Sequence, residues 1–362
     1  MTPERARELV DGSRGKQVLL VGDLMMDEWV VGSVKRISPE APIPVVAMPL
    51  DKGARTYKPG GAGNVAAILL GLGARVRVLG VVGDDGFGER LLADLKGRGA
   101  DVSGVLKDPH RPTSHKMRIL AGRHQLLRVD TESTAALGDE VAGKLRDEVR
   151  AGLGASDVIL VADYAKGVLS EASLPHEVMA EARAAATPLC ADPKPDNMDL
   201  FRGAWLVSPN EAEALRAAGT GNAQGGERPA DARPEGLSPE IARAGHALRE
   251  QLETEAVFVT MGDRGIAVFT RDRAVDFVPA RRFDVPSAEP GHAATAVGDG
   301  TGCGDAASAA SALAIAAGGS FREAAELANA AGGVVSRFVG VYSPTAAEVL
   351  AAFESAAAGD PR

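Results

Sequence analysis

A short glycine-rich segment, Asp299–Asp305, constrains the fold of this chain more than any other part of its sequence. It reads Asp-Gly-Thr-Gly-Cys-Gly-Asp and runs into an alanine-rich stretch, Ala306–Ala317, with high helix propensity. Glycines this dense disfavour a helix or strand interior and suit a loop that approaches a ligand closely. The segment therefore predicts a tight loop leading onto a helix N-terminus, where backbone N–H groups and the helix dipole favour an anion.

Asp305 is the carboxylate in the first turn of this expected helix. A bound anion would repel it, so Asp305 is poorly placed to bind a phosphate. It is well placed to accept a proton from a hydroxyl group that attacks phosphorus. The plainer alternative is a glycine-rich turn that caps a buried helix.

The composition is that of a globular protein, with 45% hydrophobic and 25% charged residues in 362. The net charge of −9 argues against a nucleic-acid partner held by bulk positive charge. Two cysteines, Cys190 and Cys303, fit a reducing compartment without a disulfide framework. We see no signal-peptide pattern and no apolar run of membrane-spanning length, and we expect a cytoplasmic protein without a membrane partner.

Short apolar runs that end in polar residues alternate with helical patterns along the chain. Strands are expected at Gln17–Val21, Val76–Val82, Val158–Ala162, Leu189–Ala191, Trp205–Ser208 and Val257–Thr260, and an antiparallel pair at Ile266–Phe269 and Ala274–Val278. This alternation predicts an α/β fold with a mainly parallel sheet and a site along the carboxyl edge of its strands. We expect one domain over residues 1–362, with irregular surface insertions at 219–239 and 285–297.

Two further pairs of short strands predict a small sheet that stands apart from the main one, formed by about residues 29–48 and 113–129. Its strands are expected at Trp29–Val34, Pro44–Met48, Thr113–Leu120 and Gln125–Val129. A second glycine-rich loop, Pro59–Ala66, lies between these pairs and precedes a helical pattern. Asn64 in this loop could hydrogen-bond a polyol, although a plain turn is an equal alternative.

The order Asp-x-Thr-Gly-x-Gly-Asp at the start of a helix resembles the C-terminal signature of the ribokinase-like (PfkB) sugar kinases, and Gly60–Asn64 resembles their N-terminal sugar motif. The resemblance implies a ribokinase-like three-layer fold, with a mainly parallel central sheet, helices on both faces and a small β-sheet lid. It implies an ATP-dependent carbohydrate kinase that uses Mg²⁺. Whether a monovalent cation also binds is left open by the resemblance. It also implies a homodimer formed through the lid.

The same resemblance assigns roles to individual residues. It makes Asp305 the catalytic base and gives the anion hole to the amides of Gly302, Cys303 and Gly304. It assigns the sugar to Asp23, Asp27, Gly61, Asn64 and Asp163, and offers four cations for a substrate phosphate: Arg36, Lys116, Arg118 and Lys166. It assigns the nucleotide to Lys194, Asn210, Thr260, Gly262, Asp299, Thr301 and Asn329, and the metal to Glu213.

Several of these residues have plainer interpretations. Asp23 could simply form a strand-end turn, Asn210 could be a helix cap, and Asn329 a solvated helix residue. The four cations could be ordinary strand-surface charge. The six histidines show no metal-ligand spacing, so a structural zinc site is not expected.

Within the family, five segments resemble the kinases of the ADP-heptose pathway: Gly22–Asp27, Arg36–Val45, Gly60–Ala66, Gln125–Asp130 and Asp163–Gly167. Those kinases phosphorylate D-glycero-β-D-manno-heptose 7-phosphate on its anomeric hydroxyl, giving the 1,7-bisphosphate. Many are fused to a nucleotidyltransferase domain, for which we expect no room in 362 residues. Cys303 departs from the alanine usual at its position. Two alternatives stay open: a kinase of an unphosphorylated sugar or nucleoside, and a non-catalytic sugar- or nucleotide-binding protein.

Overall fold

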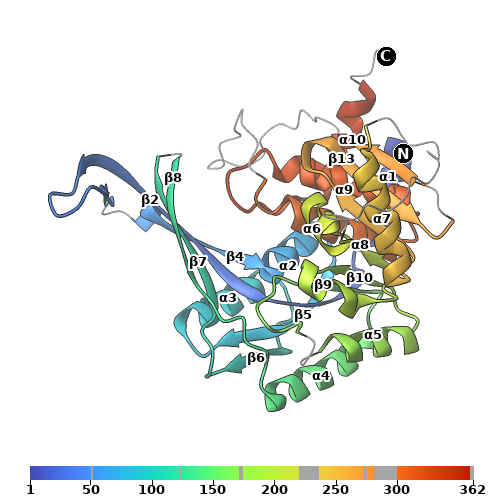
Figure 1. Cartoon of the computed structure of the whole chain (residues 1–362), viewed down its shortest axis with the longest axis horizontal. Helices are drawn as coiled ribbons and strands as arrows, with labels where there is room; N and C mark the ends of the chain where they lie inside the picture. The colour runs from blue at the N-terminus through green and yellow to red at the C-terminus, as the bar shows by residue number, and fades with distance from the viewer. Residues whose placement is uncertain are drawn as a thin grey trace.

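The computed structural model describes residues 1–49, 52–122, 124–170, 174–219, 236–272, 275–280 and 300–358 (Figure 1). Asp299, the whole 285–297 insertion and most of the 219–239 insertion lie outside the described residues. No helix in the described ranges is long and apolar enough to cross a membrane.

The strands of the described chain form a nine-stranded sheet in the order β14-β13-β12-β11-β10-β9-β1-β5-β6. All neighbouring pairs are parallel except β12–β13 and β13–β14. The strands are β1 (Gln17–Gly22), β5 (Arg75–Gly83), β6 (Val105–Asp108), β9 (Val158–Ala162), β10 (Leu189–Asp192), β11 (Leu206–Val207), β12 (Ala256–Thr260), β13 (Gly265–Thr270) and β14 (Val275–Pro279). The mainly parallel sheet expected from the apolar runs is confirmed, whereas β6 was not predicted.

Alternate side chains of each buried strand point to opposite faces of the sheet, so both faces need cover. Val18 and Leu20 of β1 join a core covered by α1 (Pro3–Ser13), α2 (Ala62–Gly71), α3 (Gly86–Gly97), α8 (Cys303–Ala316), α9 (Phe321–Val335) and α10 (Ala346–Ala358). Leu19 and Val21 join the other core, under α4 (Asp139–Leu153), α5 (Pro175–Ala184), α6 (Glu211–Ala217) and α7 (Pro239–Leu252). These helices on both faces of the sheet make the expected three layers.

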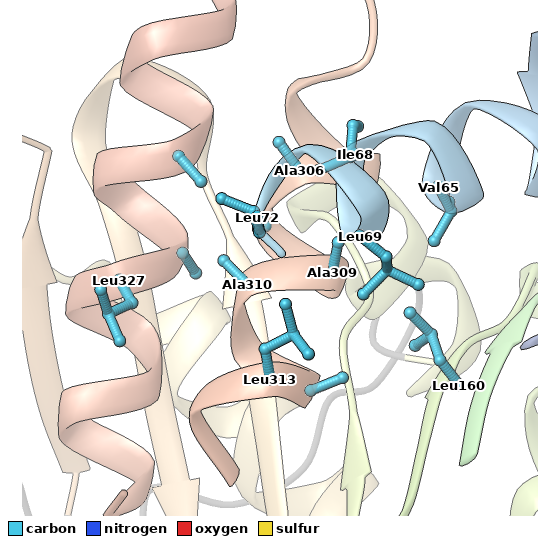
Figure 2. Close-up of a cluster of buried hydrophobic side chains, with 14 of the residues drawn as sticks. Val65, Ile68, Leu69, Leu72, Leu160, Ala306, Ala309, Ala310, Leu313 and Leu327 are labelled. Atoms are coloured by element: carbon cyan, nitrogen blue, oxygen red, sulfur yellow. The ribbon is translucent and has the colours of Figure 1, made fainter. Parts of the chain in front are cut away.

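Helices α2 and α8 pack together in the first of these cores (Figure 2). Leu69 of α2 is fully buried in the same core as Ala309 and Leu313 of α8. The small alanine side chains along α8 permit this close approach, and all its residues from Ala306 to Ala314 are buried. The packing brings the first turns of the two helices side by side.

A second sheet in the order β3-β2-β7-β8, with β4 also paired to β2, projects from the body as an arm (Figure 1). We call it the lid; it contains β2 (Leu24–Ile37), β3 (Pro44–Ala47), β4 (Arg55–Gly61), β7 (Ser114–Ala121) and β8 (His124–Thr131). The separate small sheet is confirmed. The sequence pattern was wrong about one of its strands, because β2 is a continuous strand of 14 residues rather than a short one at 29–34.

Candidate active site

The expected site residues gather where the parallel strands end. Asp23 follows β1, Asp163 follows β9, and Lys194 follows β10. The loop of residues 163–168, which we call the 163–168 loop, faces the first turns of α2 and α8. Carboxyl ends of parallel strands in open α/β sheets form the usual binding crevice.

Asp305, in the first turn of α8, accepts two short hydrogen bonds. Asn64 from the first turn of α2 donates Nδ2–H to Oδ2 at 2.5 Å, and the Tyr164 hydroxyl donates to Oδ1 at 2.5 Å. Burial raises the pKa of the Asp305 carboxyl, and these two hydrogen bonds partly offset that rise. The two glycine-rich loops of the sequence therefore meet at one carboxylate.

Glycine is required at two positions of this meeting point. Gly302 has φ +81° and caps α8, and a Cβ there would lie 3.0 Å from Nδ2 of Asn64. Gly61 has φ +54°, and a Cβ there would lie 2.6 Å from the carbonyl oxygen of Asp23. A side chain at position 302 would push the two helix N-termini apart, and one at position 61 would push α2 away from the end of β1.

The first turn of α8 contains the three residues predicted to form an anion hole. The Cys303 amide donates to Gly300 O at 3.2 Å, and the Ala306 amide makes the first helical bond, to Gly302 O at 3.0 Å. The amides of Gly304 and Asp305 have no acceptor within the helix, as in any first turn. Thr301 lies in the turn just before Gly302, and Gly304 is exposed.

Asp23 is buried, with 1% of its surface exposed, and accepts three backbone hydrogen bonds from the 163–168 loop. The donors are the amides of Tyr164 at 2.8 Å, Lys166 at 3.1 Å and Val168 at 3.3 Å. Burial raises the pKa of Asp23 to about 6. These contacts give Asp23 the strand-end role that was the plainer interpretation, and a sugar hydroxyl would have to share its oxygens.

Asp163 is buried in the same way and connects the loop to the segment after β10. It accepts from the amides of Ala165 at 2.7 Å and Lys194 at 3.0 Å, and from Asn197 Nδ2 at 2.8 Å. A sugar hydroxyl would therefore have to share the oxygens of Asp163 with these three donors.

The residues predicted for the nucleotide and the metal lie along the next strands. Lys194 Nζ donates to Glu213 Oε1 at 2.6 Å, and Asn210 and Glu213 form a capping box at the start of α6. Thr260 pairs with Asn210 in a parallel bridge, and Gly262 follows with φ +60°. Asn329 donates to Val278 O at 2.8 Å, which connects α9 to the end of β14.

Asp192 is a half-buried carboxyl at the end of β10, and desolvation raises its pKa to about 7. Lys194 lowers that pKa, and Glu213 and Asp305 raise it through charge repulsion. Ser308 of α8 donates to it at 3.1 Å. Asp192 was not singled out from the sequence, because the groups that shift its pKa, Glu213 of α6 and Asp305 of α8, are distant in the chain.

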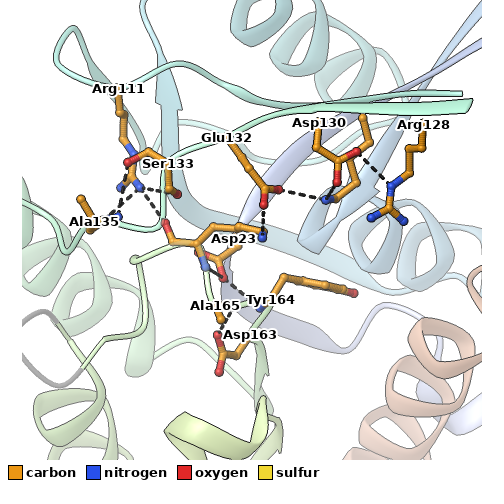
Figure 3. Close-up of polar contacts among 12 residues, drawn as sticks. Asp23, Arg111, Arg128, Asp130, Glu132, Ser133, Ala135, Asp163, Tyr164 and Ala165 are labelled. Carbon is orange, nitrogen blue, oxygen red and sulfur yellow. Dashed lines mark hydrogen bonds and ion pairs between the residues drawn. The ribbon is translucent and has the colours of Figure 1, made fainter.

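Three of the four cations predicted to meet a substrate phosphate already have carboxylate partners, which include Asp130 and Glu132, labelled in Figure 3. Glu132 accepts from Lys166 Nζ at 2.6 Å and from Lys116 Nζ at 2.9 Å. Lys116 also contacts Asp130 at 3.1 Å. Arg118 pairs with Asp27, and its guanidinium lies 5.0 Å from the ring centre of Trp29.

Arg36 is not brought to this cluster. It is exposed near the far end of β2, nine positions beyond Asp27. At ~3.3 Å per residue that is roughly 30 Å along the strand. Arg36 therefore belongs to the tip of the lid rather than to the site.

Tyr164 and Glu132 were not singled out from the sequence. Tyr164 stood within the quoted Asp163–Gly167 motif, so the signal for it was present. Glu132 sits one residue beyond β8, and only the strand register places it between two lysines.

The fold and the site define a class of protein, the ribokinase-like kinases. The family profile described as pfkB family carbohydrate kinase matches residues 29–347 of this chain. The chain belongs to that family, and it is an ATP-dependent sugar kinase.

Among relatives, the chain is similar to two proteins named Bifunctional protein HldE. It is 37% identical over 354 residues to the one from Geobacter metallireducens, which covers 97% of this chain and 65% of the relative. The one from Caulobacter vibrioides is 38% identical over 347 residues, covering 96% and 65%. The chain thus spans just under two thirds of the length of these relatives and is consistent with their kinase domain.

Solved structures share the fold at low identity. A ribokinase from Arabidopsis thaliana, complexed with ribose and ATP, has a TM-score of 0.67 at 19% identity and covers 94% of this chain and 99% of that one. Phosphofructokinase-2 from Escherichia coli, in complex with substrates and products, has a TM-score of 0.69 at 16% identity, covering 94% and 98%. These neighbours confirm the ribokinase-like fold.

Proposed function

We propose that this kinase transfers the γ-phosphoryl group of ATP to the anomeric hydroxyl of a sugar phosphate, with D-glycero-β-D-manno-heptose 7-phosphate as the substrate. The observation that carries the transfer step is the Asp305 carboxylate, placed among first-turn amides of α8 and held by Asn64 and Tyr164. The similarity to the HldE proteins and the Arg36–Val45 segment support the choice of heptose.

In this proposal Asp305 accepts the proton of the attacking hydroxyl. The amides at the start of α8 and the helix dipole stabilise the charge on the transferred group. Asp27, which contributes to the field at Asp305, lies where β2 leaves the body and can face the sugar together with Asn64. Positioning and charge stabilisation supply most of the rate in phosphoryl transfer.

A divalent cation fits the nucleotide edge of the site. Asp192 has like-charged neighbours, Glu213 and Asp305, that raise its pKa, and a bound cation would offset this repulsion. Within the described residues no group of three or more His, Cys, Asp or Glu could hold a metal ion. Mg²⁺ commonly uses one or two carboxylates together with substrate phosphates. Glu213 would hold Mg²⁺, which neutralises phosphate charge when bound; a monovalent cation could add to this.

The substrate phosphate would meet the ion pairs at the base of the lid. In the described part of the chain, the ion pairs of Lys116, Lys166 and Arg128 involve two carboxylates, Asp130 and Glu132, so this group has one more positive than negative charge. An anionic sugar would compete with Glu132 for the two lysines. We also propose that the chain acts in the cytoplasm as a single kinase domain, and that it forms a homodimer through the lid.

The test is kcat/KM for heptose 7-phosphate against free heptose, ribose and fructose 6-phosphate, with the product identified by NMR. A charge-assisted contact is worth roughly 1.5–3 kcal/mol, or about tenfold or more in kcat/KM. If two contacts form, removing the substrate phosphate should lower kcat/KM at least ~100-fold. If ribose or another unphosphorylated sugar is preferred, the heptose assignment is wrong and the kinase acts on a neutral sugar.

A further inference from the structure

The Tyr164 hydroxyl donates to the carboxylate that we propose as the base, and the proposed function leaves open what this hydrogen bond does to the ionisation of that carboxylate. Its oxygen lies 2.5 Å from Oδ1 of Asp305, while Asn64 takes Oδ2. A carboxylate offers about four lone-pair positions. Two are filled here, and the remaining two can receive a substrate hydroxyl without displacing either donor.

The backbone around Tyr164 fixes where its phenol points (Figure 3). The Tyr164 amide donates to Asp23. The next residue, Ala165, has φ +55°, which residues other than glycine rarely adopt. Asp163 holds the Ala165 amide at 2.7 Å, and Arg111 donates to the Lys166 carbonyl at 2.6 Å. A loop held at this many points keeps the phenol directed at Asp305.

Tyr164 can act on Asp305 only as a neutral donor. Burial and the charges of Asp305, Asp192 and Asp23 raise the pKa of the phenol well above its usual value. A neutral hydroxyl that donates to a carboxylate stabilises the ionised carboxylate.

Some of the other groups around Asp305 raise its pKa and others lower it. Burial and the charge of Asp27 raise the pKa of Asp305, whereas Lys194 and the two hydrogen bonds lower it. The repulsion between Asp192 and Asp305 acts in the same sense as Asp27. A general base must be ionised before the hydroxyl attacks, so the donors that oppose burial decide over which pH range Asp305 can work.

We propose that Tyr164 is a positioning residue that holds Asp305 ionised and correctly oriented for proton transfer. This role rests on the proposed function, in which Asp305 is the base. It extends the machinery from one carboxylate to a unit of three residues from three separate elements: α2, the 163–168 loop and α8.

The experiment measures kcat/KM for the sugar as a function of pH, at saturating ATP, in the wild type and in Tyr164→Phe. Loss of one charge-assisted hydrogen bond should move the acid limb of the profile upward by ~1 pH unit or more. Activity falls as pH drops through the pKa of Asp305, and the variant has the higher pKa. On the plateau above that pKa, kcat/KM should stay within about tenfold of wild type, because the base itself remains.

The matched control is Tyr342→Phe. Tyr342 donates to Glu348 at 2.6 Å in a buried pair within the C-terminal part of the chain, outside the proposed site. This control should leave the acid limb in place. A Tyr164→Phe profile that keeps the wild-type acid limb, or moves it to lower pH, overturns the proposal, as does an equal shift in both variants.

If Tyr164→Phe folds but is inactive, the ionisation of Asp305 can be measured without turnover. The ¹³Cγ resonance of Asp305, assigned by its loss in Asp305→Asn, should titrate at higher pH in Tyr164→Phe than in the wild type. If Tyr164→Phe does not fold, 3-fluorotyrosine can be introduced in a Tyr342→Phe background. The fluorinated phenol is a stronger donor, so the same resonance should then titrate at lower pH, and an unmoved titration overturns the proposal.

Asp305→Asn separates this inference from the proposed function. If Asp305→Asn keeps near wild-type kcat, Asp305 is not the base and the proposed mechanism fails. If Asp305→Asn loses ~10²–10⁴-fold in kcat while the Tyr164→Phe acid limb is unchanged, only the role of Tyr164 fails.

Discussion

Cys303 shows how much one residue's surroundings decide its chemistry. It opens α8 and is only partly buried, and its thiol donates to Gly332 O on α9 at 3.5 Å. The chain's other cysteine, Cys190, is buried in the central sheet, and burial raises the pKa of its thiol to about 12. The two cysteines should therefore differ strongly in reactivity.

We predict that iodoacetamide labels Cys303 well before Cys190, and that ATP with Mg²⁺ slows the labelling of Cys303. Alkylation there adds bulk beside the amides of α8 and should abolish activity. Peptide mass spectrometry with and without nucleotide measures both rates, and Cys190 is the internal control. Equal Cys303 rates under the two conditions would place this thiol outside the nucleotide site.

The charged residues show where sequence reasoning stops. Asp305 was predictable because its loop and its helix are adjacent in the chain. The partners of Lys116 and Arg118 were not, since the register of β7 against β2 and β8 brings Asp27, Asp130 and Glu132 to them. Cations that looked available in the sequence are paired in the fold.

At the scale of elements, Glu132 connects the lid to the body. It follows β8 and bonds Lys116 of β7 and Lys166 of the 163–168 loop. The hydrogen bonds from these lysines lower the pKa of Glu132 against the effect of burial, so it is ionised at neutral pH. The lid base and the loop that carries Tyr164 thus share one carboxylate.

We predict that Glu132→Gln loosens the base of the lid. Each lost charge-assisted bond should raise amide hydrogen exchange in β8 about tenfold, as measured by mass spectrometry. Glu140→Gln is the control, because Glu140 makes a single exposed pair with Lys144. Exchange in β8 that matches the wild type would mean that backbone pairing alone holds the lid.

Some of the strands, like some of the site residues, were predictable from the sequence, and others were not. The long parallel strands were predictable from apolar runs, because burial on both faces demands them. The last three residues of strand β4, Pro59 to Gly61, were predicted as part of a glycine-rich loop. Strand β4 is extended because β2 pairs with it from Leu24 to Val30, a contact that no local propensity encodes.

At the scale of the whole molecule, the lid leaves apolar surface uncovered. Eight of the ten large hydrophobic residues that are exposed in the described chain belong to lid segments, including Ile37 at 59% and Leu127 at 55% exposed. An apolar patch of this kind commonly marks an interface. It supports the proposed homodimer.

We predict that the wild type sediments as a dimer at micromolar concentration, and that Ile37→Glu with Leu127→Glu makes it monomeric. Val339→Glu is the control, because Val339 is 50% exposed and lies outside the strands of the lid. Circular dichroism should show the same helical content in all three proteins. A wild type that sediments as a monomer would contradict the proposed dimer.

Strand β2 connects the base of the lid to its tip as one continuous element. It starts two residues after β1 ends and runs without interruption through Asp27 to Ile37. Fourteen residues at ~3.3 Å each make an arm of about 45 Å, so a tilt of about 5° at its base moves its tip by roughly 4 Å. A partner that binds the tip and tilts the lid would therefore also move Asp27 at its base. A small displacement at the proposed sugar site would therefore accompany a large displacement of the tip.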